Sequence, residues 1–446
     1  MLSESDVVEK CNNEDIELVR LIWVDNAGIE RAYSVSADRI ESTFENGVNI
    51  PPIQQTFTDF DIPTMEGPYG ATGEVRKVPD SESFRKLPYA ERTAAMLCNI
   101  YELDQTPWDA DPRSSLKTFL DDFEYTLNAA FEPEWYMLKE QDGELVPADE
   151  SGCFAVDGHQ SAHEIILDIV DALKEQGMNL SVYYPEYGPG QQEVVIDHAK
   201  GLRAADNQTF YKQTVKSVVK QHGLKASFVP KPLADGPGSG CHIHISLWDE
   251  DENVFYDGKG SPYGLSDKGR HFVGGLLEHA PALVALTAPS IMSYKRLQPH
   301  MWASAYTAWG PDNREAVVRV PSSNWGEPSK TTRVEWKAAD NMANPYLALL
   351  GILAAGADGI ERELEPGKPA EKDPDLLSEK ERKGRGIDRL PETLGEALDQ
   401  LESDEVLKDT LGEELFESYA AAKRAVWDEF TSETTEWEIG RYTQYY

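Results

Sequence analysis

The sequence is poor in positive charge. Its 446 residues carry 42 Lys and Arg against 79 Asp and Glu, which gives a formal net charge of −37. A chain this acidic repels nucleic acid and anionic membranes, so we expect neither as a partner. The acidic residues are spread along the whole chain. This pattern suits a protein that stays soluble in high salt and predicts a halophilic source; an ordinary acidic cytosolic protein is the alternative.

Cysteine and long apolar runs are also scarce. The four cysteines, Cys11, Cys98, Cys153 and Cys241, form no CxxC pair and stand far apart. This spacing argues against a disulfide scaffold and indicates a reducing compartment, so we expect a cytoplasmic protein. No apolar stretch reaches the roughly 18 residues of a membrane span. The first residues lack the basic and apolar segments of a signal peptide, so we expect none.

Apolar residues make up 40% of the chain, enough for a substantial core in two or three domains. Residues 16–35 alternate with the period of a β-hairpin, and 91–103 form a strand-like apolar run. Between them, 47–90 is rich in Pro, Gly, Thr and Asp, which predicts a long loop followed by short strands. We therefore predict a small β-rich domain over 1–105 and a second domain over 106–446.

The second domain is predicted to alternate helices with strands. Helices are expected at 114–130, 206–222, 340–362, 394–401 and 413–430. A further helix is expected to begin at a capping box, Ser161–Glu164. Strands are expected at 131–138, 181–187, 191–196, 225–230, 241–248, 305–309, 314–320 and 332–337. The highly charged residues 363–390 are predicted to form an exposed loop. Because several strand interiors are polar, we expect an antiparallel sheet with one wet face.

Several acidic residues are predicted to share that wet face. Glu132 and Glu134 are two residues apart on a strand and therefore point the same way. Glu186 and Glu193 come from the two arms of a hairpin built around Gly-Pro-Gly. Like charges side by side are costly unless a cation lies between them. The alternatives are a solvated edge strand and an ordinary surface turn.

A glycine-rich bend precedes a strand that carries two histidines. His242, His244 and Ser246 lie on one face of this strand, directly after Gly238-Ser-Gly, where glycine lets a backbone approach a ligand closely. Histidines at alternate positions suit a metal or a phosphate. Satisfied core histidines occur at similar rates, so the pattern alone leaves both interpretations open.

The basic side chains of this region are predicted to be buried and to need anionic partners; they are Arg296, Arg314, Arg319, Arg333 and Lys337. Arg333, Glu335 and Lys337 share one strand face, where the alternative is an ion-pair ladder across a sheet.

The charges of these segments add up to a distinctive chemistry. The five glutamates on the predicted interior face are Glu132, Glu134, Glu186, Glu193 and Glu335, and an interior face does not hold them without cations. Oxygen ligands with a single imidazole, that of His242, suit Mg²⁺ or Mn²⁺ better than Zn²⁺ or copper. Two such ions and the basic groups leave surplus positive charge for a polyphosphate and a carboxylate. The pattern predicts metal-assisted phosphoryl transfer.

Five motifs resemble the glutamine synthetase family in order and spacing, over nearly the whole chain: FEPEWY, PEYGPGQQEV, KPLADGPGSGCHIHISLW, SYKRLQPHMWASAYTAWGPDNREAVVRVP and RVEWKAADNMANPYLALLGILAAGADGIE. The resemblance implies an α+β fold, with a β-grasp N-terminal domain and a catalytic domain in which helices surround a curved antiparallel sheet. It implies a ligase that phosphorylates the γ-carboxylate of glutamate with ATP, after which ammonium or an organic amine displaces phosphate. The implied assembly is a homo-oligomer, a dodecamer of two rings.

The resemblance also implies a role for each site residue. One metal site would be Glu134, Glu186 and Glu193, and the second would be Glu132, His242 and Glu335. The nucleotide would contact His244, Ser246 and Arg333, and the transferring phosphoryl group would contact Arg314 and Arg319. Arg296 would bind the α-carboxylate of glutamate, with Gly238, Lys337 and Trp302 also on the substrate side. Glu186 is in addition a candidate anionic partner for the amine.

Four positions depart from the family pattern. Residues 47–55 lack the family's aspartate, Trp302 stands where a flap glutamate is expected, Pro237 replaces an asparagine, and Lys337 replaces an arginine. The first two changes remove residues that shape an ammonium site, and Trp302 offers an apolar, cation–π surface instead. We therefore favour a glutamate–amine ligase for a polyamine, alkylamine or ethanolamine over plain glutamine synthetase. A catalytically silent relative with a structural or regulatory role, and a guanidino kinase, are further alternatives.

Overall fold

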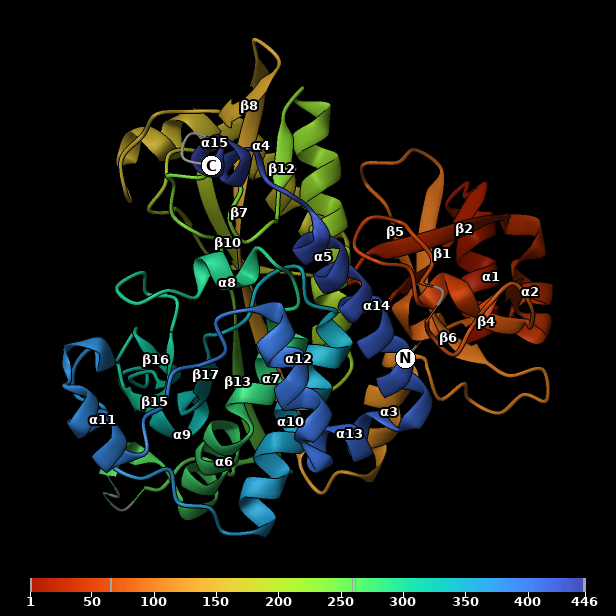
Figure 1. Cartoon of the computed structure of the whole chain (residues 1–446). Helices are drawn as coiled ribbons and strands as arrows, with labels where there is room; N and C mark the ends of the chain where they lie inside the picture. The colour runs from red at the N-terminus through yellow and green to blue at the C-terminus, as the bar shows by residue number, and fades with distance from the viewer. Residues whose placement is uncertain (1, 65, 259, 261, 444–446) are drawn as a thin grey trace.

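The computed structural model describes residues 2–64, 66–258, 260 and 262–443, and it contains two sheets with helices packed around them (Figure 1). The first sheet has six strands in the order β2-β1-β6-β4-β3, with β5 paired to β6. Its elements are α1 (Glu4–Asn13), β1 (Leu18–Val24), β2 (Glu30–Ser36), α2 (Ile40–Asn46), β3 (Val48–Ile50), β4 (Val75–Pro79), β5 (Arg85–Lys86) and β6 (Thr93–Tyr101). The predicted hairpin at 16–35 and the strand at 91–103 are confirmed as β1–β2 and β6.

The second sheet has eleven strands and follows the order β15-β16-β17-β13-β7-β10-β9, with the remaining strands paired to β7 or β13. Its strands are β7 (Thr126–Gln141), β8 (Glu144–Pro147), β9 (Leu180–Pro185), β10 (Gln191–Ile196), β11 (Ala199–Lys200), β12 (Lys225–Ser227), β13 (Cys241–Asp249), β14 (Glu252–Asn253), β15 (Tyr306–Pro311), β16 (Ala316–Val320) and β17 (Val334–Trp336). The predicted antiparallel pairing holds across this sheet except between β15 and β16, which are parallel.

Helices surround this sheet. They are α3 (Pro112–Asp122), α4 (Val156–Glu175), α5 (Arg203–Gln221), α6 (Asp267–Glu278), α7 (Ala280–Thr287), α8 (Ser293–Arg296), α9 (Pro328–Thr331), α10 (Pro345–Glu361), α11 (Glu379–Arg385), α12 (Leu394–Ser403), α13 (Glu405–Leu411), α14 (Glu413–Ser432) and α15 (Glu436–Tyr442). Five short 3-10 helices complete the pattern, at Ala37–Arg39, Pro52–Gln55, Ser81–Ser83, Pro262–Gly264 and Pro374–Leu376.

The two faces of the second sheet differ because side chains alternate along each strand. On β13, Cys241, Ile243, Ile245 and Leu247 belong to the hydrophobic core, while the residues between them are polar. The same alternation sets Phe131 of β7 apart from its neighbouring glutamates. One face is therefore apolar and covered by helices, and the other carries the polar side chains that the sequence predicted to share a face.

The apolar face is held largely by α10, which is hydrophobic on all sides. Leu347, Leu350 and Leu353 are fully or almost fully buried against the core shared with α6, α7 and α12. Burial of one such leucine stabilises the fold by about 2 kcal/mol. The helix begins after Asn344, whose side chain accepts hydrogen bonds from the backbone N–H groups of Tyr346 and Leu347. The predicted start of this helix at Asn344-Pro345 is confirmed.

Several predicted boundaries were wrong for local reasons. The helix expected at 114–130 ends at Asp122, because residues from Thr126 onward pair with β13 as part of β7. The capping box expected at Ser161 does not exist: α4 begins at Val156, and the Ser161 hydroxyl donates to the Asp157 carbonyl inside the helix. The segment 363–390, predicted as loop, contains the short helix α11.

The first sheet is tied to the rest of the chain by buried polar contacts. Arg113 of α3 donates to both carboxylate oxygens of Asp206 on α5 at 3.0 and 2.8 Å, and to Asp80 at 2.8 Å. Helix α14 lies beside the first sheet (Figure 1) and pairs Lys423 with Asp59 at 2.6 Å. The boundary predicted at residue 105 falls between β6 and α3 and stays a prediction.

All four cysteines are free in the structure. Among the described residues, no helix is long and apolar enough to cross a membrane.

Candidate active site

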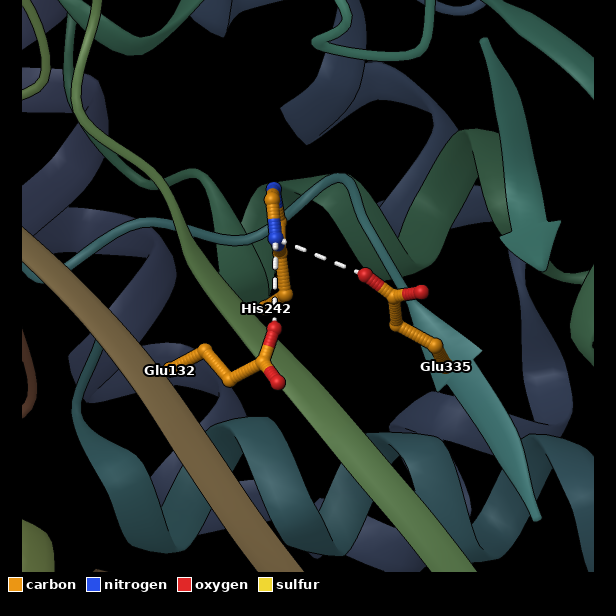
Figure 2. A group of neighbouring side chains, drawn as sticks. All are labelled: Glu132, His242 and Glu335. Carbon is orange, nitrogen blue, oxygen red and sulfur yellow. Dashed lines mark ion pairs between the residues drawn. The ribbon is translucent and has the colours of Figure 1, made fainter. Parts of the chain in front are cut away.

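Three strands bring two glutamates and a histidine together on the polar face of the second sheet. Glu132 lies on β7, His242 on β13 and Glu335 on β17, and all three side chains point into one space (Figure 2). His242 Nδ1 lies 3.4 Å from Glu335 Oε1 and 3.9 Å from Glu132 Oε2. One ligand atom from each lies within 4.8 Å of the others. We name these three residues the imidazole cluster.

Basic side chains surround the imidazole cluster. Arg319 on β16 donates to Glu335 Oε2 at 2.8 Å, and Lys337 Nζ lies 3.5 Å from Glu335 Oε1. Lys337 also donates to His242 Nε2 at 3.3 Å. The imidazole Nε2 therefore accepts, and a neutral ring keeps Nδ1 on the side of the two carboxylates. The lysine that replaces the family's arginine thus lies beside two of the predicted metal ligands.

The next polar residues along β13 extend the same face. Arg333 donates from Nε to His244 Nδ1 at 3.0 Å, and His244 Nε2 lies 3.0 Å from Glu132 Oε1. Ser246, two residues farther on, accepts a hydrogen bond from the indole of Trp248 at 2.9 Å. Two of the residues predicted on the nucleotide side, His244 and Ser246, thus follow one another along β13, and Arg333 reaches His244 from the start of the neighbouring strand β17.

Glu134, Glu186 and Glu193 form a neighbouring set, which we name the carboxylate cluster. Glu134 on β7 lies opposite Glu193 on β10 in the strand register. Glu134 Oε2 accepts from Gly240 N at 2.9 Å and from Gln191 Nε2 at 3.1 Å. Glu193 Oε1 accepts from Tyr184 at 2.6 Å. These hydrogen bonds fix the directions of the carboxylates but supply no full positive charge.

Electrostatics separate the two clusters. Burial disfavours ionisation of Glu335, but Lys337, the two histidines and Arg319 outweigh burial and lower the pKa of Glu335 to about 2. Glu132 is only partly buried, and the two histidines hold its pKa well below the usual range. Burial and Lys337 lower the pKa of His242 to about 4, so this imidazole is neutral near pH 7 and able to ligate a metal.

In the carboxylate cluster the shifts have the opposite sign. Burial and the Glu134 charge raise the pKa of Glu186 to about 7. Burial, then Glu134 and Glu132, raise the pKa of Glu193 well above its ordinary range. The pKa of Glu134 is also raised by burial, although Arg296 opposes that shift. Like charges therefore face one another here, and Arg296 and Lys337 offset them only in part, at Glu134.

Among the described residues, only the imidazole cluster brings three ligand atoms within 4.8 Å of one another, a spacing that suits a divalent cation; the three carboxylates of the carboxylate cluster do not come that close. Glu335 Oε1 is buried and makes no hydrogen bond, although burial of an unsatisfied carboxylate oxygen is costly. The carboxylate cluster repels itself, as its raised pKa values indicate. Carboxylate oxygens with one neutral imidazole are a donor set for Mg²⁺ or Mn²⁺. The residues present are thus suited to hold such ions.

Arg296 is buried where two glycines leave space for it. Its guanidinium donates to the backbone carbonyls of Ala339 at 3.0 Å and Lys337 at 3.3 Å. A Cβ on Gly238 would lie 2.7 Å from Arg296 Cγ, and one on Gly240 would lie 2.5 Å from Arg296 Nη2. The glycine-rich bend therefore makes room for an arginine, an explanation that the sequence did not reveal.

Two expectations about the arginines differ from the structure. Arg314 was expected to be buried, but it is exposed, because it lies in the turn between β15 and β16. Arg319 is only partly buried, and it faces the imidazole cluster through its bond to Glu335. Buried-arginine reasoning failed at Arg314 because its apolar neighbours belong to the strand that follows.

The loop that carries Trp302 has an unusual backbone. His300, Trp302 and Ser304 adopt φ angles of 62°, 54° and 66°, a left-handed conformation that is costly for residues other than glycine. The indole of Trp302 is exposed to 59%, while its backbone N–H donates to Glu315 Oε1 at 2.9 Å. Sequence reasoning missed Glu315, whose only sequence signal is a single acid directly before an apolar strand.

Comparisons with known proteins identify the family of the chain. Residues 3–108 match the model of the glutamine synthetase N-terminal domain, and residues 109–442 match that of the glutamine synthetase catalytic domain. The chain belongs to the glutamine synthetase family. Glutamine synthetase from Methanocaldococcus jannaschii is 37% identical, over 100% of this chain and 99% of the relative. That from Halobacterium salinarum is 35% identical, over 99% and 97%.

A solved structure of GmaS without ligand has a TM-score of 0.85 to this chain, at 31% identity over 98% of each chain. The fold predicted from the sequence, with its sheet and surrounding helices, is therefore confirmed as the glutamine synthetase fold. Membership makes this protein a ligase that forms C–N bonds. Glutamine synthetases use ATP and divalent metals, bind glutamate with ammonium or an amine, and are generally oligomeric.

Proposed function

We propose that this protein is a glutamate–amine ligase that works through γ-glutamyl phosphate. The γ-carboxylate oxygen of glutamate attacks the terminal phosphorus of ATP and releases ADP. The amine nitrogen then attacks the acyl carbon, phosphate leaves, and the nitrogen loses a proton, which yields a γ-glutamyl amide. The observation that carries the amine preference is Trp302, an exposed indole where the family pattern expects a glutamate.

In this proposal each of the two clusters binds its own metal ion. The carboxylate cluster would hold one Mg²⁺ or Mn²⁺, and the imidazole cluster would hold the second. Bound ions screen the repulsion between the γ-phosphate of ATP and the glutamate carboxylate. Burial and the charge of Lys337 keep His242 neutral, and Arg319 fixes Glu335 through Oε2. Both effects prepare the ligands before the substrates arrive.

The basic residues would handle the anionic substrates. His244 and Ser246 on β13, with Arg333 directly before β17, would bind the nucleotide. Arg314 is exposed and free to reach the transferring phosphoryl group, while Arg319 would approach it from the imidazole cluster. Arg296, packed on Gly238, would attract the α-carboxylate of glutamate. Fixed donors of this kind stabilise charge as it develops.

The amine preference follows from which group faces the nucleophile. An ammonium ion is small and needs only anions and hydrogen-bond acceptors around it. An indole adds an apolar surface that contacts carbon and attracts a cation by its π face. Trp302 therefore favours a nucleophile with at least one alkyl group, such as an alkylamine, ethanolamine or a polyamine.

Plain glutamine synthetase activity is the second candidate. It is favoured by the names of the curated relatives, which are 35–37% identical to the chain and are called glutamine synthetase. A coupled assay separates the two. Phosphate release with ATP and glutamate is measured for ammonium and for a panel of amines at matched concentrations. We expect faster turnover with at least one amine; faster turnover with ammonium than with every amine would refute the proposal.

The acidic surface and the assembly add two proposals. A net charge of −37 leads us to propose a halophilic protein, whose activity should rise between low and molar salt because salt screens self-repulsion. We also propose a homo-oligomer of stacked rings, a dodecamer, located in the cytoplasm. Light scattering in high salt measures the mass of the assembly, which for twelve chains is far larger than the 49.8 kDa of one chain.

A further inference from the structure

Glu315 is a buried carboxylate that has only one of its two oxygens in use. It lies directly before β16 and is 8% exposed. Its Oε1 accepts the backbone N–H of Trp302 at 2.9 Å. Among the described residues, no basic side chain forms an ion pair with Glu315, and Oε2 has no hydrogen bond. Its negative charge is therefore not neutralised.

The position of Glu315 links the Trp302 loop to the active site. The backbone N–H of Lys337 donates to the carbonyl of Val317, two residues after Glu315, at 2.9 Å. Lys337 in turn contacts His242 and Glu335 of the imidazole cluster. The nearby charges that act on Glu315 are Asp373, His300 and Lys337, and none is close enough to pair with it. Glu315 thus lies at the edge of the site, beneath the loop.

A cap on the Trp302 N–H does not require a charge, because a serine or glutamine oxygen would accept the same hydrogen bond. Burial of an unpaired carboxylate is costly, and burial indeed raises the pKa of Glu315. The cost of burying the charge of Glu315 is offset only when a cation binds next to it. The charges of the carboxylate cluster, Glu186 included, would already be committed to a metal ion.

We propose that Glu315 binds the cationic head of the amine substrate beneath the loop of residues 298–304. This inference rests on the proposed ligase function and names the residue that recognises the nucleophile. Glu315 Oε2 receives the N–H groups of an ammonium head, while the indole of Trp302 covers the alkyl part. A neutral nucleophile gains little from this carboxylate.

The test is Glu315→Gln, which keeps an oxygen for the Trp302 N–H and removes only the charge. Steady-state KM is measured for an alkylamine, which is protonated at neutral pH, and for hydroxylamine, which is neutral there. We expect the KM of the alkylamine to rise about ten- to hundredfold, since a charged hydrogen bond is lost. The KM values of hydroxylamine, glutamate and ATP should stay within about twofold.

The matched control is Glu327→Gln, which removes the same charge from an exposed site paired with Lys330 at 3.0 Å. It should change none of these constants. An unchanged alkylamine KM in Glu315→Gln, or an equal rise for hydroxylamine, would overturn the assignment, because the latter is the result of a disturbed loop.

The proposed function fails by a different result. If the unsubstituted enzyme turns over ammonium faster than every amine, the amine preference is wrong. The role of Glu315 is then tested by comparing the KM values of ammonium and hydroxylamine in Glu315→Gln and Glu327→Gln. A rise in KM for ammonium alone, in Glu315→Gln alone, supports that role.

Discussion

The imidazole cluster and the carboxylate cluster lie on the same sheet face, yet they are stabilised in opposite ways. Glu335 is fully buried but has Arg319 and Lys337 beside it, and its pKa falls to about 2. Glu186 has only hydrogen bonds and other carboxylates, and its pKa rises to about 7. One cluster is neutralised by the fold itself, whereas the other depends on ions from outside.

This difference teaches that the two predicted metal sites have different roles in the metal-free protein. Removal of the Glu335 charge from the imidazole cluster leaves the buried cation of Lys337 without a carboxylate partner. Removal of charge from the carboxylate cluster relieves repulsion. The same substitution, Glu to Gln, is therefore expected to have opposite effects on stability in the two places.

The largest effect is expected for Glu335→Gln. Loss of its charge leaves the buried Lys337 without a carboxylate partner and leaves Arg319 only the exposed Asp312, at 4.0 Å; breaking a buried pair costs about 3–5 kcal/mol. Urea unfolding of the metal-free protein, at fixed protein and salt concentration, measures the free energy. Glu327→Gln on the exposed loop should leave it unchanged within about 0.5 kcal/mol. Equal stability of Glu335→Gln and the parent would show that the imidazole cluster is not neutralised by those cations.

A second prediction concerns pH. Mg²⁺ binds ionised Glu186, whose pKa is about 7, so protons compete with the metal below that pH. Titration calorimetry between about pH 5.5 and 8 should show affinity falling about tenfold per unit below about 7 and levelling off above it. By the same linkage, the metal-free protein loses stability as pH rises from 4.5 to about 7, because the folded state binds more protons there. A constant affinity across this range would contradict the assignment.

Glu193→Gln is predicted to act in the opposite direction to Glu335→Gln. It removes one of three facing charges and keeps an oxygen for the Tyr184 hydroxyl. Without metal, the variant should be more stable than the parent by about 1 kcal/mol, while its Mg²⁺ affinity falls. Thermal unfolding with and without a chelator gives both values. A metal-free variant that melts below the parent would mean that the cluster already contains a balancing charge.

The smallest effect is expected for Lys337→Gln. This substitution removes a cation from the imidazole cluster and so makes its charge more like that of the carboxylate cluster. Lys337 Nζ is 3.5 Å from Glu335 Oε1 and competes there with a metal ion. Its removal should tighten Mg²⁺ binding about two- to fivefold, because Arg319 still fixes Glu335. Calorimetry at pH 7.5, where His242 is neutral, measures this change. Weaker binding in the variant would show that Lys337 organises the ligands more than it repels the ion.

Strand alternation explains how much of the site was predictable. The spacing of Glu132 and Glu134, or of His242 and His244, places each pair on one face whatever the tertiary structure. The sequence also shows where glycine permits a close approach. It does not show what approaches: the group behind Gly238 and Gly240 is Arg296, nearly sixty residues away along the chain, and only folding brings it there.

The errors share a physical origin in tertiary contacts that override local signals. Ser161 and Glu164 have the spacing of a capping box, but the residues before them continue the helix because its buried face extends to Gly158. Residues 126–130 suit a helix locally, yet pairing with β13 draws them into β7. Glu315 was missed because a lone acid before an apolar strand carries no sign of the loop that covers it.

The ion pair between Lys423 and Asp59 joins residues 364 positions apart in the sequence. During synthesis, Asp59 leaves the ribosome long before α14 exists, so the early chain holds a carboxylate whose partner has not been made. Ser418 of the same helix also accepts from Asn26, which places a second late contact on the first sheet. The N-terminal region therefore cannot complete its docking until α14 has been synthesised.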